Sequence, residues 1–163
     1  MESTWCRLPD KALAFSSSQT TPGSLAVDCS RHRGRMCTVN YVRLFAGPDG
    51  ESHFEDIAVD LAPVVEYARG VPQVLLSAPR TSTGLTFVSA PPGWVGDWHP
   101  GPRRQFMVKH TGVTEVAASD GQRREFGPGT VLLVEDTTGK GHFSRVLGPD
   151  DDRWFVAALA NEQ

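Results

Sequence analysis

The stretch Gly93–Gly112, GWVGDWHPGPRRQFMVKHTG, carries the most specific pattern in the chain. Five residues separate Gly93 from His99, and six residues separate Gln105 from Gly112. Glycine adopts positive φ at no steric cost, so glycines at such spacings favour turns between short strands. The stretch has the outline of a metal site, but a glutamine stands where a carboxylate is often found. It therefore raises the question of whether such a site still works in this chain.

Length and composition indicate one folded domain. The chain has 163 residues, of which 39% are hydrophobic and 21% charged, with a formal net charge of -3. That charge argues against the broad basic surface that nucleic-acid binding needs. No apolar run approaches the length that spans a bilayer. We therefore expect neither a nucleic-acid partner nor a membrane partner.

The N-terminal part differs from the rest. The segment Phe15–Ser24 is polar and without periodicity, and it has no apolar core of signal-peptide length. Met36 directly precedes the first strand-like pattern. We expect residues 1–36 to be a flexible or non-native extension and residues 37–163 to be the domain. The three cysteines, which all lie in the first 37 residues, do not form a disulfide framework, so reduced thiols in a cytoplasmic protein are expected.

From Met36 onward the chain reads as short strands between turns. It contains 16 glycines and 12 prolines, and β-branched and aromatic runs recur about every 8–12 residues. Asp120-Gly121 predicts a hairpin turn, and the run Asp150–Asp152 predicts a solvated turn. In HFEDIAVDL the apolar positions alternate, and His53 and Glu55 share their parity. About ten strands are predicted, which is the pattern of an all-β sandwich or barrel.

In its glycine and histidine spacing the chain resembles the cupins, a superfamily of small jelly-roll β-barrels. The fold is also described as a double-stranded β-helix. Their first motif is reproduced in spacing by Gly93, His99, Gln105 and Gly112, and their second by FGPGTVLLVEDTTGKGHFSRV with His142. The resemblance covers about residues 41–159. The chain also resembles one uncharacterised group of single-domain cupins, in which the metal motif is degenerate. It implies an all-β cupin jelly-roll, and we also expect a homodimer.

The resemblance implies a site at the barrel mouth. Intact cupins hold one divalent ion with three histidines and one glutamate, but here Gly101 takes the place of the second histidine and Gln105 that of the glutamate. His99, Gln105 and His142 are the candidate ligands for Fe, Mn, Ni or Zn. His53, Glu55 or Glu135 is a possible substitute ligand, the first two only if their face of the strand turns inward.

A metal-free alternative stays open. Some cupins use a histidine for proton transfer, because imidazole titrates near neutrality. His99 with Asp97, or His142 with Glu135, is a candidate pair, which makes His99, His142 and Glu135 the candidate catalytic residues. The expected function is a small-molecule enzyme acting on a carbonyl or carboxylate metabolite, as an isomerase, cyclase, lyase or dioxygenase-like enzyme. The alternative is a non-catalytic binding or sensor module.

Three further residues are candidate substrate contacts. Trp98 would form an apolar wall, although its strand parity is opposite to that of His99. Arg104 would anchor an anionic group, although an arginine pair at this position is more often a surface ion-pair site. His53 would add an imidazole.

Overall fold

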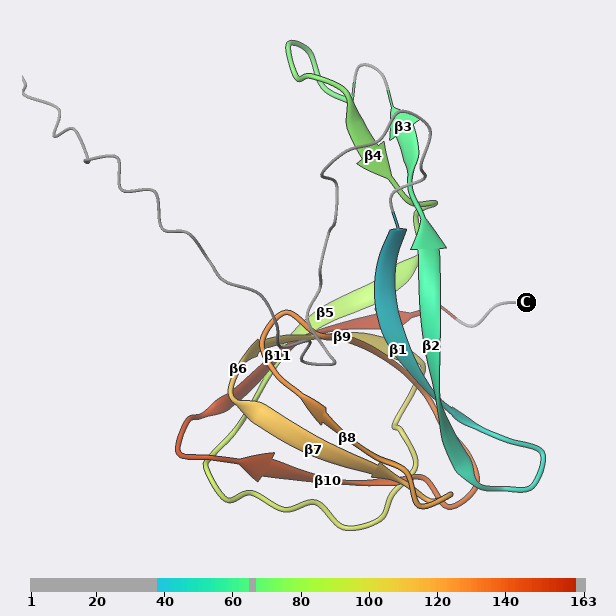
Figure 1. Cartoon of the computed structure of the whole chain (residues 1–163), viewed down its shortest axis with the longest axis vertical. Helices are drawn as coiled ribbons and strands as arrows, with labels where there is room; N and C mark the ends of the chain where they lie inside the picture. The colour runs from blue at the N-terminus through green and yellow to red at the C-terminus, as the bar shows by residue number, and fades with distance from the viewer. Residues whose placement is uncertain (1–37, 65–66, 161–163) are drawn as a thin grey trace, which may run out of the picture.

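The computed structural model describes residues 38–64 and 67–160, and in these ranges it contains eleven strands and no helix. The expected N-terminal extension and the cysteines lie outside the described residues. Within those ranges no helix is long and apolar enough to cross a membrane. Figure 1 shows the arrangement of the strands. They are β1 (Thr38–Ala46), β2 (Ser52–Asp60), β3 (Ala62–Val64), β4 (Val74–Leu76), β5 (Ser82–Ala90), β6 (Gln105–Thr111), β7 (Val113–Ala118), β8 (Arg123–Phe126), β9 (Val131–Glu135), β10 (His142–Leu147) and β11 (Asp152–Leu159).

The strands form two main sheets. The large sheet has the order β2-β1-β9-β6-β11-β5 and the small sheet the order β10-β7-β8. The segment 94–99 adds to the free edge of β10 through the bridges Val95–Arg145 and His99–His142. The chain thus alternates between one layer made of β5, β11, β6 and β9 and another made of segment 94–99, β10, β7 and β8. This is the eight-stranded order of a jelly-roll, and β1 and β2 widen its large sheet. The fold prediction is confirmed.

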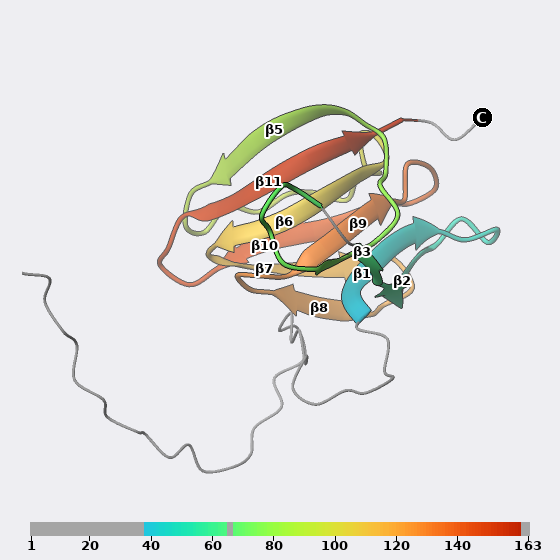
Figure 2. The same cartoon turned by 90° about the horizontal axis from the view of Figure 1, so that it is seen from above.

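The core lies between the two sheets (Figure 2). Side chains alternate between the two faces of a strand, so one parity of each strand points inward. Leu132 and Val134 of β9 pack with Val116 and Ala118 of β7 in one buried cluster. The opposite parity of the large sheet forms an outer face, which includes the half-exposed Phe155.

Strand β2 has the opposite orientation to the one that would place His53 and Glu55 in the barrel. Leu44 pairs with Phe54, and both side chains belong to the core. His53 and Glu55 therefore lie on the outer face. The reason is that the register of β1, which already packs through Leu44, decides which face of β2 is buried.

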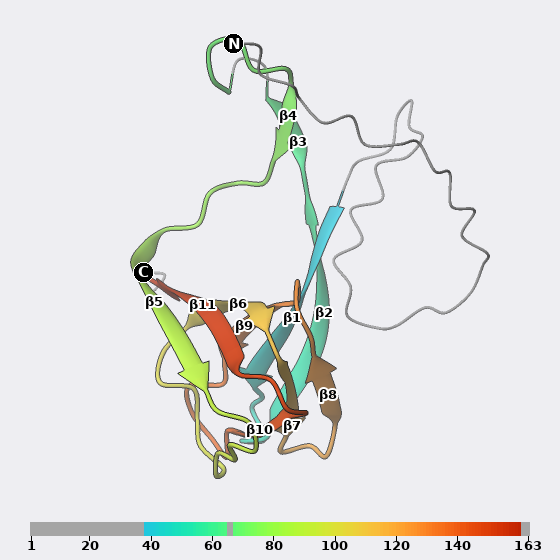
Figure 3. The same cartoon turned by 90° about the vertical axis from the view of Figure 1, so that its left-hand side faces the viewer.

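The turns agree with the sequence in most places. Asp120-Gly121 joins β7 to β8, with Gly121 at φ 96°. The run Asp150–Asp152 is an exception, because Asp152 begins β11 and is only 3% exposed. The hairpin of β3 and β4 extends away from the barrel (Figure 3).

Candidate functional site

His99 and His142 lie directly opposite each other. The backbone N–H of His99 donates to the carbonyl of His142 at 3.0 Å, and the reverse bond measures 2.9 Å. Residues that exchange both bonds project their side chains to the same face. His142 pairs on its other side with the core residue Ala118, so this face is the inner one. The imidazole centroids are 4.7 Å apart.

Gly141 makes this approach possible. Its φ is 70°, and a Cβ at this position would lie 2.1 Å from the carbonyl carbon and oxygen of His99. No side chain fits in that space. A glycine directly before His142 is therefore required for β10 to pair with segment 94–99.

Each imidazole is held through its Nδ1 atom. His99 Nδ1 lies 2.6 Å from the backbone oxygen of Asp97, and His142 Nδ1 lies 2.6 Å from Oδ2 of Asp136. A carbonyl and an ionised carboxylate only accept hydrogen bonds, so both Nδ1 atoms carry the hydrogen. In the neutral rings the lone pair is then on Nε2. The site presents two such nitrogen atoms from adjacent strands.

The partner of His142 is Asp136, so the prediction of Glu135 was wrong by one residue. Asp136 shares the inward parity of Leu132 and Val134 and is fully buried. Its Oδ1 has no hydrogen-bond partner in the described part of the chain. Burying a carboxyl is costly unless it is paired, so the bond to His142 is its main compensation. The run VLLVED is apolar at both parities, and its sequence therefore does not reveal which acidic residue turns inward.

Glu135 points to the outer face and forms two ion pairs there. Arg43 Nε donates to Oε2 at 2.6 Å and Arg104 Nε donates to Oε1 at 2.8 Å. Burial by itself raises the pKa of the Glu135 carboxyl, but the hydrogen bonds from Arg43 and Arg104 outweigh burial, and the pKa falls below its ordinary value. Glu135 and Arg104 are therefore paired with each other on the other side of the sheet from the histidines.

The other predicted substrate contacts also lie away from the histidine pair. Trp98 is 47% exposed and packs against Phe143 on the outside of the small sheet, with ring centroids 6.0 Å apart. His53 lies 2.9 Å from Asp120 and 3.3 Å from Asp49. The hydrogen bond to Asp49, followed by that to Asp120, raises the pKa of His53.

The two departures from the cupin motif differ in kind. Gln105 begins β6 on the inner face, and its amide nitrogen lies 3.7 Å from the sulfur of Met107. Gly101 has a packing role, because a Cβ there would lie 2.6 Å from Val134 Cγ1 and 3.1 Å from Asp136 Oδ1. A histidine at position 101 is sterically excluded unless its neighbours move.

The donor set does not fit a cupin metal centre. Catalytic metal sites usually provide three strong protein ligands, often with a carboxylate that balances charge. Here the Asp136 carboxylate is hydrogen-bonded to His142, and Gln105 is a neutral amide. Among the described residues, no group of three or more His, Cys, Asp and Glu side chains is placed to hold a metal ion.

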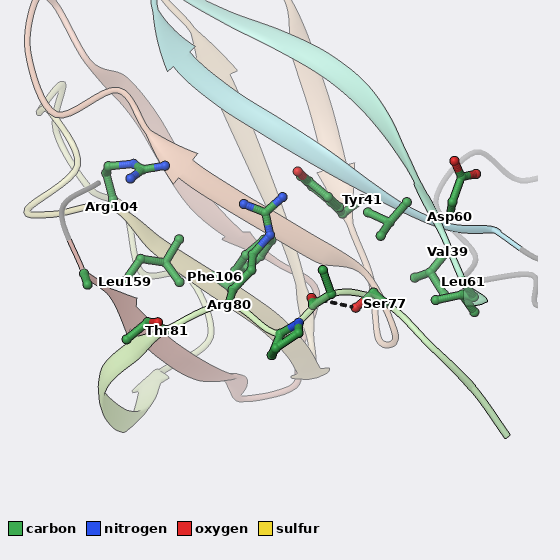
Figure 4. Close-up of a pocket in the computed structure, with 14 residues that line it drawn as sticks. Val39, Tyr41, Asp60, Leu61, Ser77, Arg80, Thr81, Arg104, Phe106 and Leu159 are labelled. Atoms are coloured by element: carbon green, nitrogen blue, oxygen red, sulfur yellow. Dashed lines mark hydrogen bonds between the residues drawn. The ribbon is translucent and has the colours of Figure 1, made fainter. Parts of the chain in front are cut away.

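A cavity of about 870 Å³ lies on the outer face of the large sheet, away from the histidine pair (Figure 4). Tyr41 and Phe106 form part of its wall, and the Arg80 guanidinium lies 5.7 Å from the Phe106 ring centroid. Of the predicted site residues only Arg104 lines it.

Comparisons with known proteins return structural likeness alone. No family model and no curated protein matches the chain. A conserved protein of unknown function from Streptococcus pyogenes is 15% identical, with 53% of this chain and 72% of that chain covered and a TM-score of 0.37. The Cnp3 cupin domain of Schizosaccharomyces pombe is 14% identical, with 76% and 84% covered and a TM-score of 0.39. A putative ethanolamine utilization protein from Salmonella typhimurium is 16% identical, with 78% and 100% covered and a TM-score of 0.30.

These likenesses are too distant to carry an argument about ligand or activity. The fold itself is defined by the sheet order and by the two motifs that meet at His99 and His142. The described residues have an all-β jelly-roll fold.

Proposed function

We propose that this protein is an enzyme that binds a small carbonyl or carboxylate compound at the pair His99 and His142 and transfers a proton without a metal ion. The observation that supports this is the pair of imidazole rings, whose centroids are 4.7 Å apart and whose Nδ1 atoms are both anchored. Such an arrangement supplies a proton acceptor and a proton donor on one face.

The two histidines have different surroundings and hence different roles. His142 is mostly buried and bonded to the buried Asp136, which holds its tautomer and stabilises the imidazolium ion. His142 Nε2 is the base that removes a proton from a carbon next to the carbonyl group. His99 is exposed, and its Nε2 in the protonated ring donates to the substrate oxygen. Returning the proton to the same or another carbon gives an isomerisation or epimerisation.

A non-catalytic binding or sensor module is the second candidate. The replacement of two motif positions by Gly101 and Gln105 favours it, since these positions supply chemistry in intact cupins. The same histidine pair would then bind an anionic or carbonyl ligand without turnover.

Proton abstraction is measurable even when substrate and product are identical. The protein is incubated with a panel of small oxo and hydroxy acids in heavy water, and deuterium incorporation next to the carbonyl group is followed by NMR. We expect incorporation with wild type, and loss of it in His142→Gln. The matched control is His53→Gln, which removes an imidazole that is also bonded to aspartate but lies on the outer face.

The outcomes separate the two candidates. Ligand-induced shifts at His99 and His142 without incorporation in any compound would assign the binding module. Incorporation that persists in His142→Gln would contradict the proposed base.

A further inference from the structure

Lys109 is the largest fully buried side chain among the described residues, and the proposed proton transfer does not use it. It lies on the inner face of β6 opposite Trp154 of β11, and its side chain is 0% exposed. Lysine is almost never fully buried unless it is paired. The surroundings of its amine therefore need a chemical explanation.

The amine lies in a closed cluster built around the carboxyl group of Asp152. Lys109 Nζ contacts Asp152 Oδ1, donates to Thr114 Oγ1 at 2.6 Å, and lies 4.2 Å from the Trp154 ring centroid. Thr114 Oγ1 donates to Asp152 Oδ1 at 2.7 Å. Trp154 Nε1 donates to the other oxygen, Oδ2, at 2.6 Å. Asp152, Thr114 and Trp154 are all at least 94% buried, with exposures of 3%, 6% and 5%.

We propose that Lys109 Nζ and Asp152 Cγ are joined by an intramolecular isopeptide bond that cross-links β6 to β11. The amine attacks Cγ, an Nζ–Cγ bond forms, and the Cγ–Oδ1 bond breaks. Oδ1 leaves as one molecule of water, which takes one hydrogen from Nζ and the hydrogen of the neutral carboxyl group. No oxidant, metal or other reactant takes part.

Each neighbour of the carboxyl group has a place in this reaction. The Thr114 hydroxyl bridges the attacking nitrogen and the leaving oxygen, so it passes the proton from Nζ to Oδ1. The Trp154 N–H stabilises the negative charge that develops on Oδ2, which remains as the amide oxygen. Attack within a preformed contact avoids the entropy cost of bringing two molecules together.

Burial favours the reactive protonation states. Desolvation lowers the pKa of the Lys109 amine. Moving the proton from the ammonium to the carboxylate gives an uncharged amine and an uncharged acid, which are the nucleophile and the electrophile that the reaction needs. The backbone holds both residues in place. Lys109 N donates to Thr130 O at 2.9 Å. The backbone of Asp152 packs so closely on Gly112 that a Cβ added to Gly112 would lie 2.8 Å from Asp152 Cα.

The mass of the denatured full-length chain tests the bond. We expect wild type to be lighter than its sequence by one molecule of water, and Lys109→Arg to have its full sequence mass. Lys140→Arg is the matched control, because Lys140 forms an exposed ion pair with Glu51 and should leave the deficit in place. Wild type at its full sequence mass would overturn the proposal and leave an ordinary buried ion pair.

A second measurement does not depend on whether a variant folds. Trypsin should fail to cut wild type after Lys109 and should release a branched peptide that joins the Lys109 and Asp152 segments. Recovery of two separate linear peptides would overturn the proposal. Asp152→Asn is expected to reach the same cross-linked mass as wild type, because ammonia then leaves in place of water.

Discussion

At the scale of single residues, Asp136 decides how His142 can act. Its carboxylate accepts from Nδ1 at 2.6 Å and keeps the lone pair on Nε2. Asp136→Asn should reverse or disorder that tautomer, and we expect deuterium incorporation to fall by about 10²-fold or more. The measurement is the NMR exchange rate at saturating substrate. Asp97→Asn is the control, since Asp97 holds His99 through its backbone oxygen, and an equal loss in both variants would contradict the role of Asp136.

Gln105 is the position at which one substitution would restore the missing carboxylate ligand of the cupin motif. Gln105→Glu would place a carboxylate on the inner face with two imidazoles, which is the donor set of a two-histidine, one-carboxylate metal site. We expect this variant to bind Fe, Mn, Ni or Zn measurably more tightly than wild type, by calorimetry and by metal content after dialysis. Adding His142→Ala should abolish the gain. No gain at all would show that position 105 is not aimed at the histidines.

At the scale of strands, two consecutive acidic residues at the end of β9 point to opposite faces of the large sheet. Val134 and Asp136 face the core, whereas Glu135 faces Arg43 and Arg104 outside. The sequence predicted β9, and it predicted Glu135 as the partner of His142. That partner is Asp136 instead. The prediction failed because a one-residue shift exchanges the faces and the apolar run fits both choices.

The outer ion pairs should affect stability without affecting the site. Glu135→Gln removes a charged acceptor from two arginines, and we expect a loss of about 1–3 kcal/mol in the free energy of unfolding at pH 7. The folded pKa of Glu135 is lowered, so its contribution exists above the unfolded pKa and disappears as pH falls through the folded pKa. Urea unfolding of both proteins between pH 7 and acid should show the difference vanishing. Changed deuterium incorporation in Glu135→Gln would contradict the separation of the two faces.

At the scale of the whole molecule, the outer face of the large sheet carries an apolar patch on β5 and β11. Phe87 is 70% exposed, Leu85 64% and Phe155 37%, and strand pairing makes them neighbours. A continuous apolar patch on a sheet indicates a protein interface. We propose that a second copy of the chain covers it and that this contact forms the expected homodimer.

Phe87→Glu tests this assembly by placing a charge in the centre of the patch. We expect wild type to have the mass of a dimer and the variant that of a monomer in light scattering after size exclusion. Trp98→Glu is the matched control, because Trp98 is also exposed but lies on the outside of the small sheet. Wild type that is monomeric at micromolar concentration would contradict the proposal.

The sequence by itself predicted the strands and most of the turns, which follow from local signals, namely β-branched runs and glycines in turns. That the motifs of His99 and His142 meet was implied by the resemblance to the cupins. The tertiary structure decided which side of each strand is buried. That choice depends on pairing with strands distant in sequence. As a result Asp136 lies beside His142, and Glu135 and His53 lie on the outer face. Lys109 is buried beside Asp152 for the same reason.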